Sequence, residues 1–445
     1  MESLQSFQET SGILIVFKTT CRQAEGRNLR TLGIFSVLAT VAVLFCSPAI
    51  AQSRSGYGST QGLESGDSVT EDIHQDDIDA GSAFRFPNEP LKPWFDAKRR
   101  WNDKYGLKLN FSYQTLAMRS NNTTGADEAA AGRGEINGSW TLVGRGTQNA
   151  GRLTFRIENR TKFGTPVVPQ TLGNEFGSGT IVGTGFSDFG FNISELAWRQ
   201  SAMSGRLMFV FGKISAAGWY GGHLLSSPKR AFQNTAFLGS NTRAFPGRGF
   251  GGGVGYRISN NYLVSAGVHD ANAKTSQSPF DTIGQEEFLY NVEFRWLPNG
   301  MDNARWDQVR LHFWHQDEKK SKGTPAGSGV NLVASHRIND RYLPFFIAGL
   351  SDGNASTFER DFAVGLGIGF DTTAAKARDT LGIGLAWGEP SNSAFQDQIT
   401  GELFYRFQLL DNFAITPSIQ WINNPTFNPS ETNVTVVGLR MRVTF

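Results

Sequence analysis

Cysteine is nearly absent from this chain. Among its 445 residues only Cys21 and Cys46 are cysteines, and both lie close to the amino terminus. If that part is cleaved as a leader, the mature chain contains no cysteine. It then forms no disulfide, has no thiolate metal site and has no cysteine nucleophile.

Long apolar runs are also missing after residue 51. A membrane-spanning helix needs about 20 consecutive apolar residues, and the mean hydropathy of the chain is −0.30. A helical inner-membrane protein is therefore excluded. The chain is nevertheless rich in Phe (35 residues) and Gly (51 residues). A transmembrane β-barrel fits this composition, because every second residue of its strands is polar and window averages hide the apolar face.

The sequence lacks the motifs of common catalytic and nucleotide-binding proteins. The formal net charge is +2 without a basic tract, so nothing indicates nucleic acid. The glycine-rich run 247–253 has neither Gly-Lys-Ser/Thr nor a strand–turn–helix context. None of the six His stands at metal-ligand spacing with a partner. We therefore expect no enzyme, no cofactor, no metal site and no nucleic-acid partner.

The amino-terminal residues predict a secretory signal peptide. Arg27 and Arg30 precede the apolar run 32–45, and a small-x-small sequence ending at Ala51 follows. This order of charged, apolar and small residues is typical of a cleavable export signal. We interpret residues 1–51 as a signal peptide with an extended amino terminus. The alternative is an uncleaved membrane anchor, which the short apolar run disfavours.

Residues 52–106 predict a flexible acidic leader followed by a short helix. The stretch 52–83 is rich in Ser, Gly, Asp and Gln and contains the acidic run 71–77, so we interpret it as a solvated tail. The aromatic residues spaced over 94–105 allow a short amphipathic helix, for which Gly106 is a natural stop. We expect this helix to pack against or inside a barrel.

The last segment of the chain alternates strictly. Its odd-numbered residues from Val437 to Phe445 are apolar, whereas Arg440 and Arg442 fall on the other face. A bacterial outer-membrane barrel turns such an apolar face toward lipid and the arginines toward a wet lumen. A terminal Phe on this strand is also typical of that class.

The same period-two alternation recurs through the rest of the chain. We therefore predict an all-β fold, a transmembrane antiparallel β-barrel of about 16 strands over residues 107–445, with a short amino-terminal helix before it. The predicted segments lie near 107–118, 137–144, 151–161, 191–202, 205–213, 248–258, 261–270, 286–297, 307–316, 328–338, 342–351, 359–371, 379–389, 399–409, 412–422 and 434–445. Tight turns are expected at 259–261, 339–341 and 410–412, and long irregular stretches at 120–135, 165–190 and 214–247.

Two segments, 362–370 and 381–388, carry Gly at nearly every position of the polar face. Glycine weakens a strand, so its repetition needs a reason. One is room for a bulky element inside the barrel, such as a loop or the amino-terminal helix. The other is curvature of the sheet. The sequence leaves both open.

The polar faces of the segments predict a charged lumen, because charges facing lipid are costly. Opposed arginines and carboxylates in a narrow wet pore set its field and size selectivity. They can also hydrogen-bond sugar hydroxyls, and an inward Trp offers a stacking face. The alternative for each residue is that it only pairs with its neighbours and solvates the wall. The candidate solute-contact residues are Arg156, Glu158, Arg160, Glu195, Arg199, Glu293, Arg295, Arg310, His312, Trp314, Glu402, Arg406 and Arg440.

Several of these segments resemble the OprB-type carbohydrate-selective porins. Pro417-Ser418-Ile419-Gln420-Trp421-Ile422-Asn423-Asn424-Pro425 resembles the family's terminal pattern Pro-x-x-Gln-Tyr-Ile-x-Asn-Pro, with Trp421 in place of Tyr. The likeness extends from about Leu107 to Phe445. Further similar segments are 211–215, 231–237, 245–247, 349–353, 388–391, 402–407 and 438–440.

The resemblance implies a porin of the bacterial outer membrane that passes sugars passively through a constriction lined by Arg and Glu. Its partners are then small sugars or polar solutes and outer-membrane lipid, and the sequence leaves monomer or homotrimer open. One alternative is a general or anion-preferring diffusion pore, which the excess of inward Arg favours. Another is a structural or adhesive barrel whose lumen is occluded by loops and the amino-terminal segment.

Overall fold

The computed structural model describes residues 64–66, 68–80, 91–121, 124–369, 379–410 and 412–445. The predicted signal peptide lies outside these residues. All described residues belong to one compact unit, Gln52–Phe445. Among them, no helix combines the length and the apolar character needed to cross a membrane.

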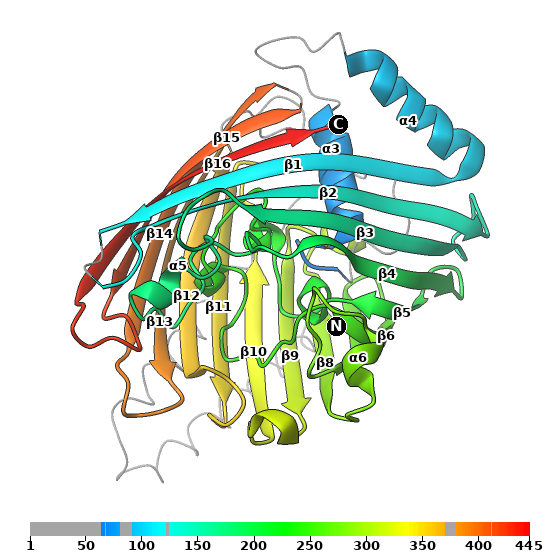
Figure 1. Cartoon of the computed structure of the whole chain (residues 1–445). Helices are drawn as coiled ribbons and strands as arrows, with labels where there is room; N and C mark the ends of the chain where they lie inside the picture. Colours follow the sequence, from blue (N-terminus) through cyan, green and yellow to red (C-terminus); the bar gives the residue numbers. More distant parts are fainter. Residues whose placement is uncertain (1–63, 67, 81–90, 122–123, 370–378, 411) are drawn as a thin grey trace, which may run out of the picture. The chain divides into compact units, whose positions relative to one another are not determined.

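Sixteen strands form one closed barrel, in which neighbours in sequence pair and β1 pairs with β16 (Figure 1). The predicted fold class is therefore confirmed. The first eight strands are β1 Leu107–Ser120, β2 Glu128–Val143, β3 Gly151–Lys162, β4 Gly190–Ala202, β5 Leu207–Ile214, β6 Gly249–Arg257, β7 Tyr262–Asp270 and β8 Phe288–Trp296. The others are β9 Gln308–Gln316, β10 Gly327–Ser335, β11 Tyr342–Ser351, β12 Phe358–Gly369, β13 Thr380–Pro390, β14 Gln398–Leu410, β15 Phe413–Asn423 and β16 Asn433–Thr444.

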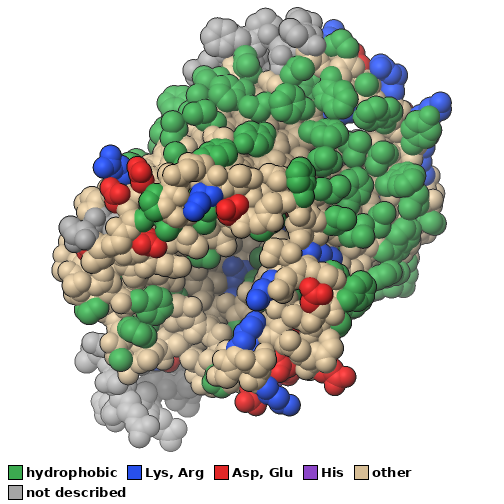
Figure 2. All heavy atoms as spheres, viewed as in Figure 1, with side chains coloured by type: hydrophobic (Ala, Val, Ile, Leu, Met, Phe, Trp, Pro, Cys, Tyr) green, Lys and Arg blue, Asp and Glu red, His purple; other side chains and the backbone are tan. Residues whose placement is uncertain are grey.

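The two faces of the wall follow the alternation. On β16, Val437, Leu439 and Met441 are 40% to 50% exposed, whereas Arg440 and Arg442 are buried inside. Figure 2 shows hydrophobic side chains over a broad band of the outer wall, with acidic and basic side chains gathered at its borders. An apolar outside and a polar inside are what a barrel in a lipid bilayer requires.

Strand β2 begins earlier than the sequence predicted, at Glu128 rather than near 137. Its outward positions include Gly132 and Gly138, which give no apolar signal in the sequence. Rings of adjacent strands cover them instead: a Cβ added to Gly138 would lie 2.1 Å from the Phe155 ring. Aromatic rings laid over strand glycines in this way replace the missing side chains.

The connections differ in length at the two ends of the barrel. Short turns at one end include 203–206 between β4 and β5, 258–261 between β6 and β7, and 336–341 between β10 and β11, where Asn339 and Asp340 both have φ +53°. This conformation is that of a type I′ hairpin. The long connections follow odd-numbered strands and hold most of the short helices. These are α5 Leu172–Glu175, η2 Ala216–Gly218, η3 Leu224–Ser226, η4 Thr235–Phe237, α6 Phe280–Ile283 and η6 Lys320–Lys322, with η5 Met301–Asn303 at the opposite end.

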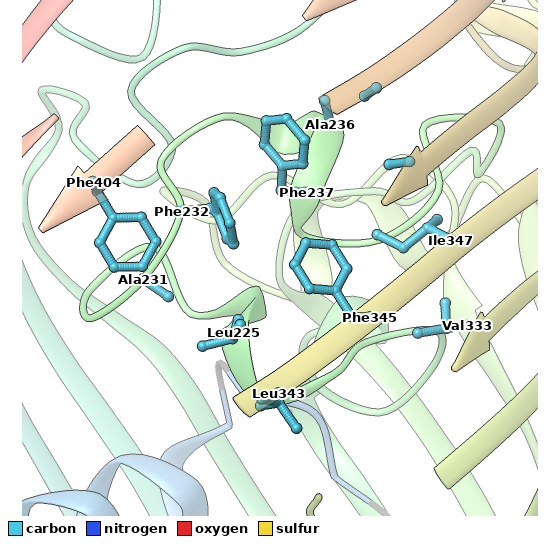
Figure 3. Packing of buried hydrophobic residues seen from close by; sticks show 12 residues of the cluster. Leu225, Ala231, Phe232, Ala236, Phe237, Val333, Leu343, Phe345, Ile347 and Phe404 are labelled. Atoms are coloured by element: carbon cyan, nitrogen blue, oxygen red, sulfur yellow. The ribbon is translucent and has the colours of Figure 1, made fainter. Parts of the chain in front are cut away.

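The connection between β5 and β6, residues 215–248, folds into the barrel, and we refer to it as the lumenal loop. Its Phe232 and Phe237 are fully buried. The Phe232 ring centroid lies 5.5 Å from that of Phe345 on β11 and 4.9 Å from that of Phe404 on β14 (Figure 3). The loop therefore has an apolar footing on the inner wall.

The inward glycines make room for this loop. A Cβ added to Gly384 on β13 would lie 2.6 Å from a ring carbon of Phe237, and one added to Gly367 on β12 would lie 2.8 Å from Leu225. Both distances are too short for a real side chain. Of the two explanations for the glycines, space for an inserted loop is therefore the one that the structure supports.

Helix α4 (Lys92–Tyr105) occupies the predicted helical stretch and ends at Gly106, whose φ is +72°. Figure 1 shows it outside the barrel wall. The Trp94 ring centroid lies 5.6 Å from that of Phe111 on β1, and Lys98 Nζ donates to the Phe445 carbonyl at 2.7 Å. The helix therefore packs against the barrel near the chain's last residue.

The acidic segment predicted to be a flexible leader forms a helix inside the barrel. Helix α3 (Val69–Ala80) lies against β1, β2 and β3 (Figure 1). Val69, Asp72, Ile73 and Asp76 are each 5% exposed or less. The expectation of a solvated tail is therefore wrong for α3, because its carboxylates find basic partners that composition alone does not reveal.

Candidate functional site

All the predicted lumen residues are buried, on the face opposite the exposed apolar side chains. They do not form one ring. The structure distributes them among a charge ladder on β2 and β3, a set around the amino-terminal segment, and two sets that hold the lumenal loop. Two more, His312 and Trp314, lie beneath that loop, and Arg406 lies apart from these sets on β14, beside Gln408. Each set is described in turn.

The charge ladder joins β2 and β3. Arg133 Nη2 lies 2.6 Å from Glu135 Oε1 and 3.1 Å from Glu158 Oε1. Arg160 Nη2 lies 2.6 Å from Glu158 Oε2, and Arg156 Nε lies 3.7 Å from Glu135 Oε1. Residues two apart on a strand share a face and cross-strand partners stand side by side, so the register places these opposite charges together.

Asp72 of α3 completes this ladder. Its Oδ2 lies 2.7 Å from Arg156 Nη2, and its Oδ1 accepts from Arg230 Nη1 of the lumenal loop at 2.9 Å. Lys229 of the same loop also pairs with this carboxylate. One carboxylate therefore joins the helix, the wall and the loop.

Asp76, one helical turn further on, binds the last strand, β16, which pairs with β1 to close the barrel. Its Oδ2 lies 2.9 Å from Arg442 Nη2 on β16, and it also pairs with Arg230. Burial alone raises the pKa of this carboxyl, but the Arg230 and Arg442 guanidinium groups outweigh burial and lower the pKa to about 2. Asp76 is therefore ionised at any physiological pH.

The amino-terminal segment reaches other parts of the lumen as well. The Glu64 carboxylate pairs with Arg199 on β4, whose Nη2 lies 2.7 Å from Glu195. The Glu64 carbonyl accepts from Arg310 on β9 at 3.0 Å. Glu71 pairs with Arg305 in the connection before β9. Because β9 stands half the barrel away from β1, the segment crosses the lumen from wall to wall.

Glu402 and Arg440 hold the lumenal loop. The Glu402 carboxylate on β14 accepts from the backbone N–H of Gln233 at 2.7 Å and of Asn234 at 2.9 Å. Arg440 Nη1 on β16 donates to the Ala231 carbonyl at 3.0 Å. These two predicted residues therefore bind the polypeptide of the loop itself.

Glu293, Arg295 and Arg310 form a second anchor. Glu293 on β8 accepts from the backbone N–H of Gly221 at 2.7 Å, and Arg295 Nη2 donates to the Trp219 carbonyl at 2.8 Å. Glu293 also lies 2.5 Å from Arg295 Nε and 3.7 Å from Arg310 Nη1. The start of the lumenal loop is thus pinned to β8 and β9.

His312 and Trp314, both on β9, lie beneath the loop. The His312 ring stacks on Tyr220 with centroids 5.4 Å apart, and its Nε2 lies 3.0 Å from Asn291 Oδ1. Trp314 is 3% exposed and packs in a cluster with Tyr220 and Phe245 of the loop. The Trp314 ring is therefore covered and offers no open stacking face.

Sequence reasoning missed several residues that the structure brings to the lumen. The sequence alone places Asp72 and Asp76 in a solvated tail, and the basic pair Lys229 and Arg230 in an irregular stretch. Arg133 lies in the part of β2 that was not recognised as a strand. A signal was present, since an acidic run near the amino terminus and an excess of inward arginines have opposite charges.

The chain is similar to known porins in sequence and in fold. The family model described as "Carbohydrate-selective porin, OprB family" matches residues 127–335 and 328–445. The high-pH structure of Pseudomonas putida OprB is similar with a TM-score of 0.63 and 16% identity, covering 79% of this chain and 97% of that chain. A mutant Rh. blastica porin gives a TM-score of 0.45 at 12% identity, covering 76% of this chain and 100% of that one. No curated protein sequence matches the chain.

Proposed function

Because this chain belongs to the OprB family of carbohydrate-selective porins, we propose that it passes small sugars passively through a lumen narrowed by the lumenal loop and helix α3. Porins of this family and fold are channels of the bacterial outer membrane. The exposed apolar band of the wall fits a lipid environment (Figure 2).

The observation that carries the proposal is the inserted loop. Its Leu225 and Phe237 rest on inner glycines of β12 and β13, and buried carboxylates bind its amides. A loop fixed at both apolar and polar contacts gives the pore a defined width. A defined width with polar walls is what size and solute selectivity require.

We assign solute contact to the inward residues that do not bind the lumenal loop. Arg406 on β14 is 7% exposed and contacts Gln408 two residues along the same face. Arg160 on β3 is 5% exposed beside Glu158. We assign these guanidinium groups to hydrogen bonds with sugar hydroxyls, because a planar fork of donors matches paired hydroxyl oxygens.

One observation favours a second candidate function, a barrel with an occluded lumen. The segment 64–80 crosses the lumen and pairs with cations on opposite walls. If it never moves, the barrel serves a structural or adhesive role instead of transport. A shorter amino terminus then opens a pore that the intact protein lacks.

Liposome swelling separates the candidates. The mature protein, beginning at Gln52, is reconstituted and challenged with sugars of rising size. We expect swelling with monosaccharides and a steep fall with tri- and tetrasaccharides. A general pore swells with neutral solutes of the same size regardless of chemistry. An occluded barrel gives no swelling with any sugar until residues 64–80 are deleted.

Export is tested separately. We expect the cellular protein to begin near Gln52, to fractionate with the outer membrane and to run as a heat-modifiable band. An intact apolar amino terminus in the inner membrane would contradict the proposed export.

A further inference from the structure

We propose that helix α3 is a tethered internal ligand occupying a binding site for carboxylated sugars, which displace it. The site consists of Arg156, Lys229, Arg230 and Arg442, here called the cation site, with the neighbouring wall amides of β1 and β2. This inference rests on the proposed function of the lumen as a solute path, and its test reads the helix rather than transport.

The cation site is built for carboxylates. Asp72 is held by Arg156 at 2.7 Å and by Arg230 at 2.9 Å. Asp76 is held by Arg442 at 2.9 Å. Charge-assisted pairs of this kind at buried positions are the strong form of the hydrogen bond. Any carboxylate of similar reach can take the same place.

Amides beside the cations have capacity that α3 does not use. Asn110 Oδ1, Gln114 Oε1 and Asn137 Nδ2 are buried without a hydrogen-bond partner among the described residues. All three side chains are 2% exposed or less. Gln114 pairs in register with Arg442, and Asn137 with both Asn110 and Arg156. Unfilled donors and acceptors therefore stand beside the basic groups.

These two features define the ligand. Buried polar groups normally find partners, and hydroxyl groups can satisfy an amide oxygen and an amide nitrogen alike. A carboxylate alone would satisfy the cations and leave the amides unfilled. A neutral sugar would do the reverse. A sugar acid supplies both kinds of group, so the geometry points to that class.

The contacts that hold helix α3 also allow a solute carboxylate to replace the helix at the cation site. Its buried apolar side chains among the described residues are Val69 and Ile73, and its other buried contacts are ionic. Ion pairs exchange for other ion pairs at little net cost, whereas a large apolar core does not. A solute carboxylate that binds the same cations therefore competes directly with Asp72 and Asp76.

The test measures exposure of α3 by thiol labelling, because the mature chain has no cysteine of its own. Val69→Cys places a thiol at a position that is fully buried in the docked helix. Ser259→Cys, in an exposed turn, reports the reagent's intrinsic rate. Labelling is followed in detergent with gluconate, glucose, acetate or chloride, the salts at equal ionic strength.

We expect gluconate to accelerate labelling at Val69→Cys at least tenfold over chloride, and glucose to have no effect. Acetate should act only at much higher concentration. In an Asn110→Ala background, the half-maximal gluconate concentration should rise several-fold and that of acetate should not change. Equal effects of gluconate and chloride, or slow labelling in every solution, would overturn the proposal.

A charge-matched pair of variants checks the ionic hold. Asp72→Asn with Asp76→Asn should label fast without gluconate, whereas Asp96→Asn with Asp103→Asn, the same change on the outer helix α4, should label as slowly as the parent. If the first pair labels slowly and still responds to gluconate, the carboxylates do not hold the helix and the competition model fails. Failure of liposome swelling, in contrast, would concern the proposed transport and not this binding site.

Discussion

Glu402 binds two consecutive backbone amides of the lumenal loop with the two oxygens of one carboxylate, at 2.7 Å and 2.9 Å. The interaction needs a side chain with two acceptors and no donor. At the scale of one residue, the position of the loop therefore depends on the number of hydrogen-bond acceptors that the side chain offers as much as on its charge. Glu293 uses one oxygen for the Gly221 amide and the other for Arg295.

Glu402→Gln should loosen the loop by about 1–3 kcal/mol, because the amide NH₂ faces a backbone N–H that then loses its acceptor. We expect larger or noisier single-channel conductance with the barrel intact. Glu318→Gln, at an exposed position, serves as control. A conductance trace identical to that of the parent would show that this carboxylate does not fix the loop.

Arg406→Ala should change ion selectivity and the block of current by sugars while leaving the barrel folded. Arg406→Lys should restore little, since an ammonium lacks the planar set of donors. Planar-bilayer recordings measure both effects, with Lys274→Ala at an exposed loop position as the charge-matched control. Unchanged selectivity and sugar block in Arg406→Ala would mean that this arginine only solvates the wall.

At the scale of elements, strands β12 and β13 act as a seat for the lumenal loop. Their inward glycines leave the space that Phe237 and Leu225 fill; Figure 3 shows these two side chains in the packed cluster. A strand that is weak by itself is therefore supported by an element inserted from another part of the chain.

Gly384→Ala should destabilise the protein by about 1–3 kcal/mol through overpacking, because the new Cβ would lie 2.6 Å from the Phe237 ring. Gly401→Ala is the matched control, since its nearest neighbour, the Trp421 ring, lies at 3.8 Å. The free energy of unfolding in lipid vesicles measures both. Equal stability of the two variants would contradict the tight fit of loop and strand.

The outer face of β8 offers a second test. Val292 is the central residue of this strand and 38% exposed. Val292→Arg should cost about 2–4 kcal/mol of unfolding free energy at the bilayer midplane, and Val292→Leu should cost little. If both variants unfold like the parent, Val292 does not face the centre of the bilayer.

The sequence predicted the strands well where local alternation carries the information. The apolar side chains of 434–445 turn outward as expected, because a period of two is a property of the strand itself. The start of β2 was missed, since its outward glycines are covered by rings from other strands. The burial of helix α3 was not predicted, and the inward glycines of β12 and β13 left an inserted loop and sheet curvature equally open. In both cases the contacting residues are distant in sequence, and composition does not identify which distant segments pack together.

At the scale of the whole molecule, the lumen contains its own counter-ions. Carboxylates of the segment 64–80 neutralise arginines of β3, β4, β16, the lumenal loop and the connection before β9, together with Lys229 of the loop. The amino terminus is therefore part of the electrostatic balance of the pore. Conditions that discharge or repel this segment should change the pore as a whole.

Lowering the pH should weaken the docking of α3. Burial first, then Arg305, Lys108 and Arg230, lower the pKa of His74 to about 3. A released helix regains the ordinary pKa of about 6.5, so protons bind the released form preferentially. Docking should weaken up to about tenfold per pH unit as the pH falls below 6.5. Asp76, whose pKa is lowered to about 2, adds to this only below about pH 4.

The rate of thiol labelling at Val69→Cys, divided by that at Ser259→Cys, measures this effect between pH 7 and pH 4. His74→Gln should remove this weakening, because Asp76 stays ionised in that range. Glu71 acts in the opposite sense, since burial raises the pKa of its carboxyl and docking then gains from protonation as the pH falls. A ratio that is flat in the parent, or equally steep in His74→Gln, would exclude His74 as the sensitive group.

The seam between β1 and β16 has a consequence for how the barrel is made. It joins the first and last strands, with Ser112 beside Thr444 and Gln114 beside Arg442. A slip by one residue would turn Arg440 and Arg442 out into hydrocarbon. The arginines therefore disfavour incorrect closure, because a misaligned pairing of β1 and β16 exposes charged side chains to lipid as soon as it forms. Strand β16 can therefore pair with β1 as the last step of barrel assembly and still adopt a single register.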